Sequence, residues 1–152
     1  MNYRHAFHAG GFADVLKHIV LARILLYLQE KQAAFCVIDT HAGAGIYDLA
    51  GEEAQRGGEW LTGIARIMQA RFSQTTASLM KPYLDVVRAF NPPGAEFSTY
   101  PGSPLIALAP AVLSDSRQPE LVVATASATN RPAATAHTDT MDARFITPLA
   151  GT

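Results

Sequence analysis

The chain has 152 residues, of which 49% are hydrophobic and 16% charged, a composition that suits one domain with a buried core and excludes a wholly disordered chain. Twelve basic and thirteen acidic residues give a formal net charge of −1, so overall charge does not favour nucleic acid or membranes as partners, although a local basic face is compatible with it. The single cysteine, Cys36, excludes an intrachain disulfide and a cysteine-based zinc site. Because no apolar run reaches ~18 residues and no signal peptide is visible, we expect a cytoplasmic protein that does not span a membrane.

The first predicted element is a helix over residues 13–31, because apolar residues recur at spacings of three and four and Asp14 stands in the first turn. The apolar positions that form this stripe are Leu16, Ile19, Val20, Ile24, Leu25 and Leu28. Residues 35–39 then predict a buried parallel strand, since a nearly continuous apolar run ends in an acid. This strand leads directly into a glycine loop at residues 41–45.

The residues beyond the loop predict helices over 52–56, 60–69 and 82–90. We interpret Asn91-Pro92-Pro93-Gly94 as the stop of the last helix with a turn. A short strand over 96–100 and a turn at 101–104 follow. This order predicts an α/β protein with a Rossmann-like fold that carries a small helical insertion at about residues 46–95.

The composition changes at about Leu108, beyond which lysine is absent and Ala, Thr, Pro and Ser dominate. Residues 124–136 show neither a helical nor a strand period. Such small side chains bury too little apolar surface to offset backbone ordering, which costs about 1–2 kcal/mol per residue. We therefore divide the chain into a domain part, residues 1–107, and an atypical tail, residues 108–152. The tail is expected to be disordered or foreign to the fold, as a shifted reading frame or a fusion would make it.

The most informative stretch is Asp39-Thr40-His41-Ala42-Gly43-Ala44-Gly45, because ligands of open α/β sheets bind beyond the carboxyl ends of the strands. A tight turn without any ligand is the plainer alternative. A dinucleotide fingerprint would need a third glycine where Asp48 stands, and a P-loop would need Gly-Lys-Ser/Thr, which does not occur. An acid at a strand end followed by Gly-x-Gly is also the layout of class I methyltransferases.

Several motifs in register resemble the ribosomal large-subunit RNA methyltransferase J family. They are residues 3–10 (YRHAFHAG), 13–18 (ADVLKH), 39–45 (DTHAGAG) and 100–104 (YPGSP), with 58–67 (GEWLTGIARI) matching in the family's helical insertion. The resemblance covers about residues 1–107. It implies a class I methyltransferase fold and the transfer of a methyl group from S-adenosylmethionine to N6 of an adenine, adenine 2030, in 23S rRNA. It implies neither a metal nor a membrane, and the oligomeric state stays unknown.

The same resemblance implies site residues. His18, His41 and Ser103 correspond to positions that contact the cofactor, Lys17 neighbours them, and Tyr3 corresponds to a position that contacts the substrate RNA. Gly43 and Gly45 are expected to let the loop backbone approach the cofactor.

Each assignment has a plainer alternative. Asp14 and His18, four residues apart, are compatible with a surface pair. Ser103 before a proline is compatible with a helix cap, and Tyr3 with a frayed terminus. His5 and His8 add two further histidines to this part of the chain, but no strict metal-ligand spacing is present.

The family's Asp-Pro-Pro-Tyr motif, which grips the exocyclic amine of the target adenine, does not occur in this chain. Residues 91–94 lack the aromatic residue and precede the Pro-Gly-Ser-Pro turn. We therefore assign no catalytic residue and expect a truncated domain that is inactive alone. Two further functions stay open: a non-catalytic RNA- or cofactor-binding fragment, and a nicotinamide oxidoreductase, which Asp48 argues against.

Overall fold

A computed structural model describes residues 4–31, 33, 35–113 and 122–125. The elements follow the order η1 (His5–Phe7), α1 (Phe12–Gln29), β1 (Cys36–Asp39), β2 (Ile46–Asp48), α2 (Glu52–Gly57), α3 (Glu59–Thr62), α4 (Ile64–Gln69), α5 (Gln74–Ala89), β3 (Thr99–Pro101), α6 (Ser103–Leu113) and β4 (Val122–Thr125). β1 pairs with β4 in parallel, and β2 pairs with β3 in antiparallel orientation. None of the described helices combines the length and the apolar character needed to cross a membrane.

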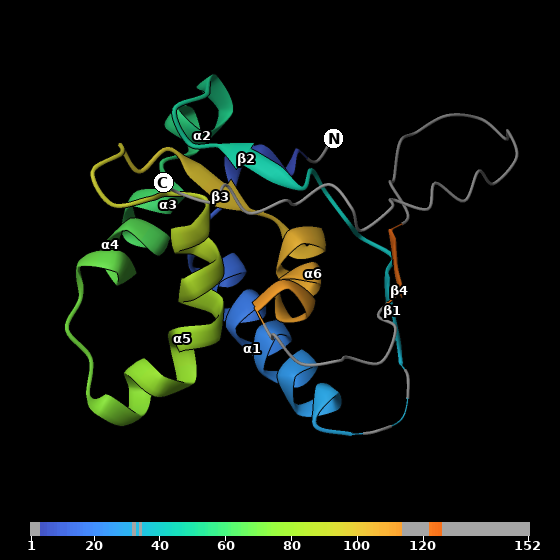
Figure 1. The fold of residues 1–152 in the computed structure, drawn as a ribbon. Helices are drawn as coiled ribbons and strands as arrows, with labels where there is room; N and C mark the ends of the chain where they lie inside the picture. The colour runs from blue at the N-terminus through green and yellow to red at the C-terminus, as the bar shows by residue number, and fades with distance from the viewer. Residues whose placement is uncertain (1–3, 32, 34, 114–121, 126–152) are drawn as a thin grey trace, which may run out of the picture.

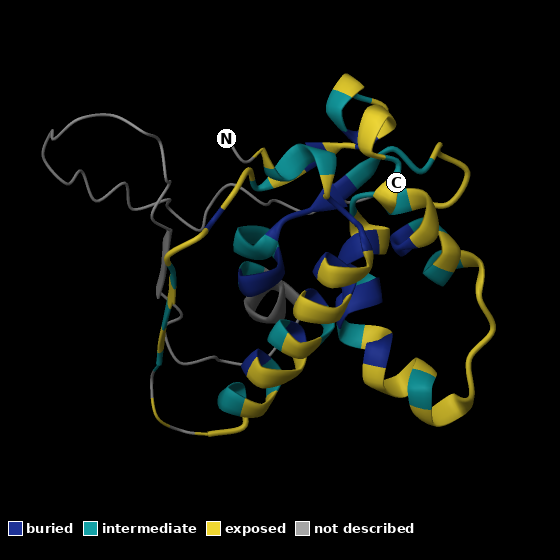
Figure 2. Cartoon of the chain, turned by 180° about the vertical axis from the view of Figure 1, so that it is seen from behind, coloured by how far each residue is buried: buried dark blue, intermediate teal, exposed yellow. Residues whose placement is uncertain are grey.

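The core lies where α1, α5 and α6 meet the β2–β3 pair, while the β1–β4 pair stands to one side (Figure 1). The largest fully buried side chains come from all of these elements and from the loops between them: Tyr83, Tyr100, Leu25, Leu49, Ile64 and Ile106. Figure 2 shows this buried centre with the exposed side of α1 turned outward. The helix insertion and the N-terminal elements therefore share a single core.

The predicted first helix is confirmed, but the predicted apolar stripe is not the side that packs. Leu25 is buried, whereas Leu16, Val20 and Ile24 are 52%, 48% and 51% exposed. The buried side of α1 is instead formed by Asp14, Val15, His18, Ala22 and Leu25. Because α1 is apolar on most of its sides, its periodicity does not identify which side faces the core.

The predicted strand is confirmed as β1, with Cys36 opposite Val122 and Asp39 opposite Thr125 in β4. The expectation that both faces are buried is wrong for the described chain, since Ile38 is 68% exposed. β4 and the end of α6 lie beyond residue 107, in the segment where the sequence analysis expects the tail. Residues 126–152 of that tail lie outside the described residues.

Two of the helices predicted within the insertion differ from their predicted bounds. The helix expected over 60–69 is broken at Gly63 into α3 and α4. A Cβ at Gly63 would lie 2.1 Å from the backbone oxygen of Gly10. The glycine at this break therefore allows the N-terminal segment to pack closely against the insertion. α5 begins at Gln74, eight residues before the predicted start, because Ser73 caps it by accepting a hydrogen bond from Thr76 N at 3.2 Å.

The segment before α1 packs on this insertion. Ile64 N donates to Gly10 O at 2.9 Å, and His8 Nδ1 donates to Glu59 Oε1 at 2.7 Å. A Cβ at Gly57 would lie 2.0 Å from Phe7 O, so a glycine is needed at this contact. The insertion is therefore the support on which η1 is held beside α1.

Asn91 ends α5 and ties it to β3, which confirms the interpretation of residues 91–94 as a helix stop with a turn. Its Nδ2 donates to Val87 O at 2.9 Å and to Thr99 O at 2.8 Å. Its Oδ1 accepts from Ser98 N at 3.2 Å and from Thr99 N at 3.1 Å. The amide thus makes four hydrogen bonds, all to backbone groups.

We predict that Asn91→Ala lowers the free energy of unfolding by about 2–4 kcal/mol, because it leaves several part-buried backbone groups without partners. Asn91→Asp, which keeps the acceptor and loses the donor, should have an intermediate effect. Urea denaturation followed by circular dichroism measures both. Glu96→Ala, at an exposed position of the same loop, should change stability by less than about 0.5 kcal/mol. Equal stability of Asn91→Ala and the unsubstituted chain would contradict this account.

Candidate functional site

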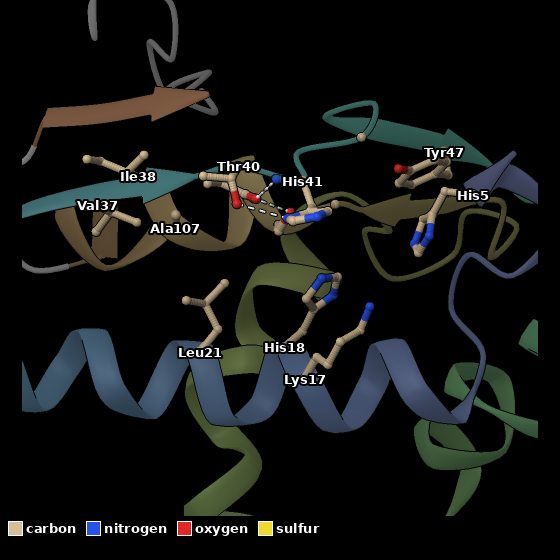
Figure 3. Close-up of a pocket in the computed structure, with 14 residues that line it drawn as sticks. His5, Lys17, His18, Leu21, Val37, Ile38, Thr40, His41, Tyr47 and Ala107 are labelled. Atoms are coloured by element: carbon tan, nitrogen blue, oxygen red, sulfur yellow. Dashed lines mark hydrogen bonds between the residues drawn. The ribbon is translucent and has the colours of Figure 1, made fainter. Parts of the chain in front are cut away.

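A cavity of about 530 Å³ opens between α1, the end of β1 with its loop, and the start of α6. Lys17, His18 and Leu21 line it from α1, and Ser103 and Ala107 line it from α6. Figure 3 shows the side chains of α1 pointing across the cavity toward β1 and the loop. The cavity therefore joins three stretches that lie far apart in the sequence.

Asp39, the last residue of β1, holds two of these stretches together. Its Oδ1 accepts a hydrogen bond from His41 N at 3.0 Å, and its Oδ2 accepts one from Ser103 Oγ at 2.6 Å. Thr40 Oγ1 and His41 Nδ1 are also hydrogen-bonded, at 2.9 Å. A single carboxylate thus fixes the loop after β1 and the first turn of α6 beside each other at the cavity.

Gly43 leaves space for the Tyr47 hydroxyl, and neither Gly43 nor Gly45 has a positive φ. Among the described residues, positive φ occurs at Gly10, Gly58 and Gly94. A Cβ at Gly43 would lie 2.0 Å from Tyr47 Oη, so a side chain at that position would require Tyr47 to move. Gly45 lies outside the cavity lining, and its carbonyl accepts from Gly102 N at 2.7 Å.

Asp14 is a buried acid with two side-chain hydrogen-bond donors as partners. His5 Nε2 donates to its Oδ2 at 2.7 Å, and Lys17 Nζ donates to its Oδ1 at 2.8 Å. Burial raises the pKa of Asp14, but the hydrogen bonds from His5 and Lys17 outweigh burial and lower the pKa to about 2. The plainer alternative, a surface pair of Asp14 and His18, is wrong, because both side chains are buried and each bonds to other residues.

His18 is 5% exposed and lines the cavity. Burial lowers the pKa of His18 to about 4, and the nearby charges of Asp14 and Asp39, which favour protonation, do not reverse this effect. The imidazole is therefore neutral at physiological pH. Its Nδ1 lies 2.9 Å from Tyr100 Oη, and its ring stacks on the Tyr100 ring with centroids 5.7 Å apart.

The predicted site residues fall into three groups. His18, His41, Ser103, Lys17 and Gly43 line the same cavity. Gly45 adjoins it, and Tyr3 lies outside the described residues. Within the described residues, no three His, Cys, Asp or Glu side chains are grouped so that they could hold a metal ion. The roles assigned to the site residues stay predictions.

Sequence reasoning missed two contributors. His5 enters the site through its bond to Asp14, and Tyr100 through its bond to His18. Both also belong to motifs that carry the resemblance, but a motif does not say which partner a side chain takes. An acid on the otherwise apolar first helix was the one available signal for a buried polar contact.

We predict that stability falls as the pH falls from 6.5 to about 4. In this window unfolded His18 binds a proton near its usual pKa of 6.5, while folded His18 resists protonation until about pH 4, so the unfolded state holds more protons. The difference amounts to about 3 kcal/mol. Asp14 acts at lower pH, between 3.8 and about 2, in the same direction.

Urea denaturation at a series of pH values tests this prediction. His18→Gln should flatten the decline between pH 6.5 and 4. Leu21→Ala, which removes an apolar side chain from the same cavity, should lower stability at every pH and keep the decline. An undiminished decline in His18→Gln would show that other groups cause it.

Comparison with known proteins was made on this background. A family model described as "Ribosomal RNA large subunit methyltransferase D, RlmJ" matches residues 32–122. Two curated relatives are both called "Ribosomal RNA large subunit methyltransferase J". The relative from Escherichia coli (strain K12) is 50% identical over 107 residues, and the relative from Haemophilus influenzae (strain ATCC 51907 / DSM 11121 / KW20 / Rd) is 43% identical over 108 residues. Each match covers 70% of this chain and 37% of the relative.

A crystal structure of a protein from Legionella pneumophila str. Philadelphia 1 matches with a TM-score of 0.56 and 35% identity. The match covers 76% of this chain and 39% of that one. The chain therefore spans well under half the length of these proteins. Since the family model matches residues 32–122, the chain belongs to this family of ribosomal RNA large subunit methyltransferases.

Proposed function

We propose that the chain forms the N-terminal part of a Rossmann-like class I methyltransferase domain whose cavity binds S-adenosylmethionine. The observation that carries this proposal is the arrangement at the end of β1, where Asp39 bonds to both the glycine loop and Ser103 around one cavity. Ligands of open α/β sheets bind beyond the carboxyl ends of the strands. The parallel pairing of β1 with β4, with α6 preceding β4 in the chain, supports the same fold class.

The cavity suits a cofactor of this kind in size and lining. About 530 Å³ lies within the range of small-molecule sites. His18, His41 and Lys17 offer polar groups, and Leu21 and Ala107 offer apolar contact. When bound, S-adenosylmethionine supplies a methyl group that its sulfonium has already activated, so the chain's task is to bind and align it.

Individual residues then have separate tasks. His18, His41 and Ser103 would hold the cofactor, with the positive charge of Lys17 nearby. Gly43 leaves room for the loop, and Gly45 fixes the loop through its bond to Gly102. None of these tasks requires a metal ion or a membrane.

The proposed substrate is the adenine at position 2030 of 23S rRNA, methylated at N6. Support comes from the curated relatives, which are named as large-subunit rRNA methyltransferases. Tyr3 would contact the RNA. Such a substrate implies a cytoplasmic protein.

We further propose that this chain does not methylate on its own. Its nearest approach to Asp-Pro-Pro-Tyr is residues 91–94, and the amide of Asn91 is already engaged in four hydrogen bonds to backbone groups. No side-chain donor or acceptor of Asn91 is left to hold an adenine amine. A non-catalytic fragment that binds cofactor or RNA is therefore the second candidate function.

A nicotinamide oxidoreductase is less well supported. Asp48, which stands where the fingerprint needs a glycine, is the last residue of β2 and accepts a hydrogen bond from Ala50 N at 2.9 Å. The segment after the loop thus forms a strand paired with β3 and not the helix that a dinucleotide fingerprint opens.

We predict that the chain binds S-adenosylmethionine and not NAD in isothermal titration calorimetry. Asp39→Ala should weaken this binding by about tenfold, because it frees both His41 and Ser103 from the carboxylate. Asp48→Ala removes an exposed acid from the neighbouring strand and should leave binding unchanged. Binding of NAD in preference to S-adenosylmethionine would overturn the proposal.

We predict no methyl incorporation when the 152-residue chain is incubated with unmethylated 23S rRNA and labelled S-adenosylmethionine. Residues 1–107 fused to the unmatched remainder of the Escherichia coli relative should restore incorporation, because the missing adenine-binding groups would then be present. Incorporation at the target adenine by the chain alone would show that its catalytic groups lie among residues that we have not assigned.

A further inference from the structure

Three buried rings from three elements form a chain of hydrogen bonds behind the cavity. His18 comes from α1, Tyr100 from β3 and Tyr83 from α5. His18 Nδ1 lies 2.9 Å from Tyr100 Oη, and Tyr100 Oη lies 3.2 Å from Tyr83 Oη. Both tyrosines are fully buried, so their hydroxyl protons must find acceptors within the protein.

Counting protons fixes the direction of this chain. Within the described residues, Tyr83 Oη bonds to Tyr100 alone. If His18 Nδ1 carried a proton and donated to Tyr100, Tyr100 would donate to Tyr83, and the Tyr83 proton would be buried without an acceptor. If Nδ1 accepts, Tyr100 donates to His18 and Tyr83 donates to Tyr100, so both hydroxyl protons are satisfied. The second arrangement avoids the cost of a buried unpaired donor.

The consequence for His18 is a defined tautomer. A neutral imidazole has one proton, and with Nδ1 accepting, that proton is on Nε2. His18 lines the cavity, and Nε2 has no hydrogen-bond partner in the described part of the chain. The ring therefore offers the cavity one N–H donor.

The charges around the ring do not change this state at neutral pH. Asp14 and Asp39 favour protonation of His18, while Lys17 and His5 oppose it, and burial keeps its pKa at about 4. Tyr83 and Tyr100 are both neutral, since burial raises the pKa of each hydroxyl. A neutral donor also suits a sulfonium ligand, which a histidinium would repel.

We propose that Tyr100 is a positioning residue that holds His18 as an Nε2–H donor toward a hydrogen-bond acceptor of the cavity's ligand. The identity of that ligand as S-adenosylmethionine rests on the proposed function, whereas the tautomer does not.

The test measures the histidine tautomer directly, without ligand, by long-range ¹H–¹⁵N correlation on the ¹⁵N-labelled 152-residue chain at pH 7. His18 should show a protonated Nε2 and an acceptor Nδ1. Tyr100→Phe keeps the ring and removes the hydroxyl, so His18 should become a mixture of tautomers. Titration with S-adenosylmethionine should then give an affinity about tenfold lower than that of the unsubstituted chain.

Tyr83→Phe is the matched control, because it removes a hydroxyl from the same buried chain but leaves Tyr100 able to donate to His18. It should keep the Nε2–H tautomer and change the affinity by no more than about twofold. A merely structural role of the hydroxyls would affect both variants alike and leave the tautomer in place.

The outcomes separate this inference from the proposed function. A protonated Nδ1 in the unsubstituted chain overturns the inference even if S-adenosylmethionine binds. The expected tautomer, lost in Tyr100→Phe, together with no binding of S-adenosylmethionine, supports the positioning role and overturns the proposed cofactor. If Tyr100→Phe does not fold, the tautomers of the unsubstituted chain and of Tyr83→Phe still decide the question.

Discussion

A carboxylate without access to water must be matched by hydrogen-bond donors, and the burial of Asp14 imposes this requirement on the first helix. The match comes from Lys17 on the same helix and from His5 on the segment before it. The N-terminal segment is thus held by an ion pair on one side and by the helical insertion on the other, where Gly10 accepts from Ile64. A substitution that removes the Asp14 carboxylate would remove the bonding partner of both His5 and Lys17 at once.

The second constraint is steric, and it acts at glycines. The insertion contacts Gly10 at Gly63, the residue at the break between α3 and α4. Beside the cavity, the absence of a side chain at Gly43 leaves space for the Tyr47 hydroxyl. The contact at Gly63 is with backbone atoms and leaves no room for a side chain, whereas a side chain at Gly43 would require Tyr47 to move. The insertion and the glycine loop are consequently parts of one packed unit, although 18 residues separate Gly45 from Gly63 in the sequence.

The order of most helices and strands can be predicted from the sequence, whereas the buried faces of these elements and the contacts between them cannot. α1 and β1 are recognisable because their apolar patterns are long or continuous, yet the side of α1 that packs is set by α5 and α6. β2 is three residues long and exists only through its pairing with β3, so no local pattern reveals it. The start of α5 is misplaced because Pro82 resembles a helix start, while the capping residue is Ser73. In the site, resemblance points to Ser103, but only the fold brings it to Asp39, 64 residues away.

The pairing of β1 with β4 has a consequence for how the chain reaches its folded state. Cys36 and Val122 are paired, although 86 positions of sequence separate them. The long loop between them must close, at a cost in chain entropy, before any hydrogen bond forms between the two strands. Contacts of such separation form slowly, whereas α1 and its neighbouring turns depend on local contacts. On a ribosome, Asp39 and the residues after it would emerge well before the strand that flanks β1 has been synthesised. β1, which forms one wall of the cavity, therefore gains its partner strand late, after the local helices can form.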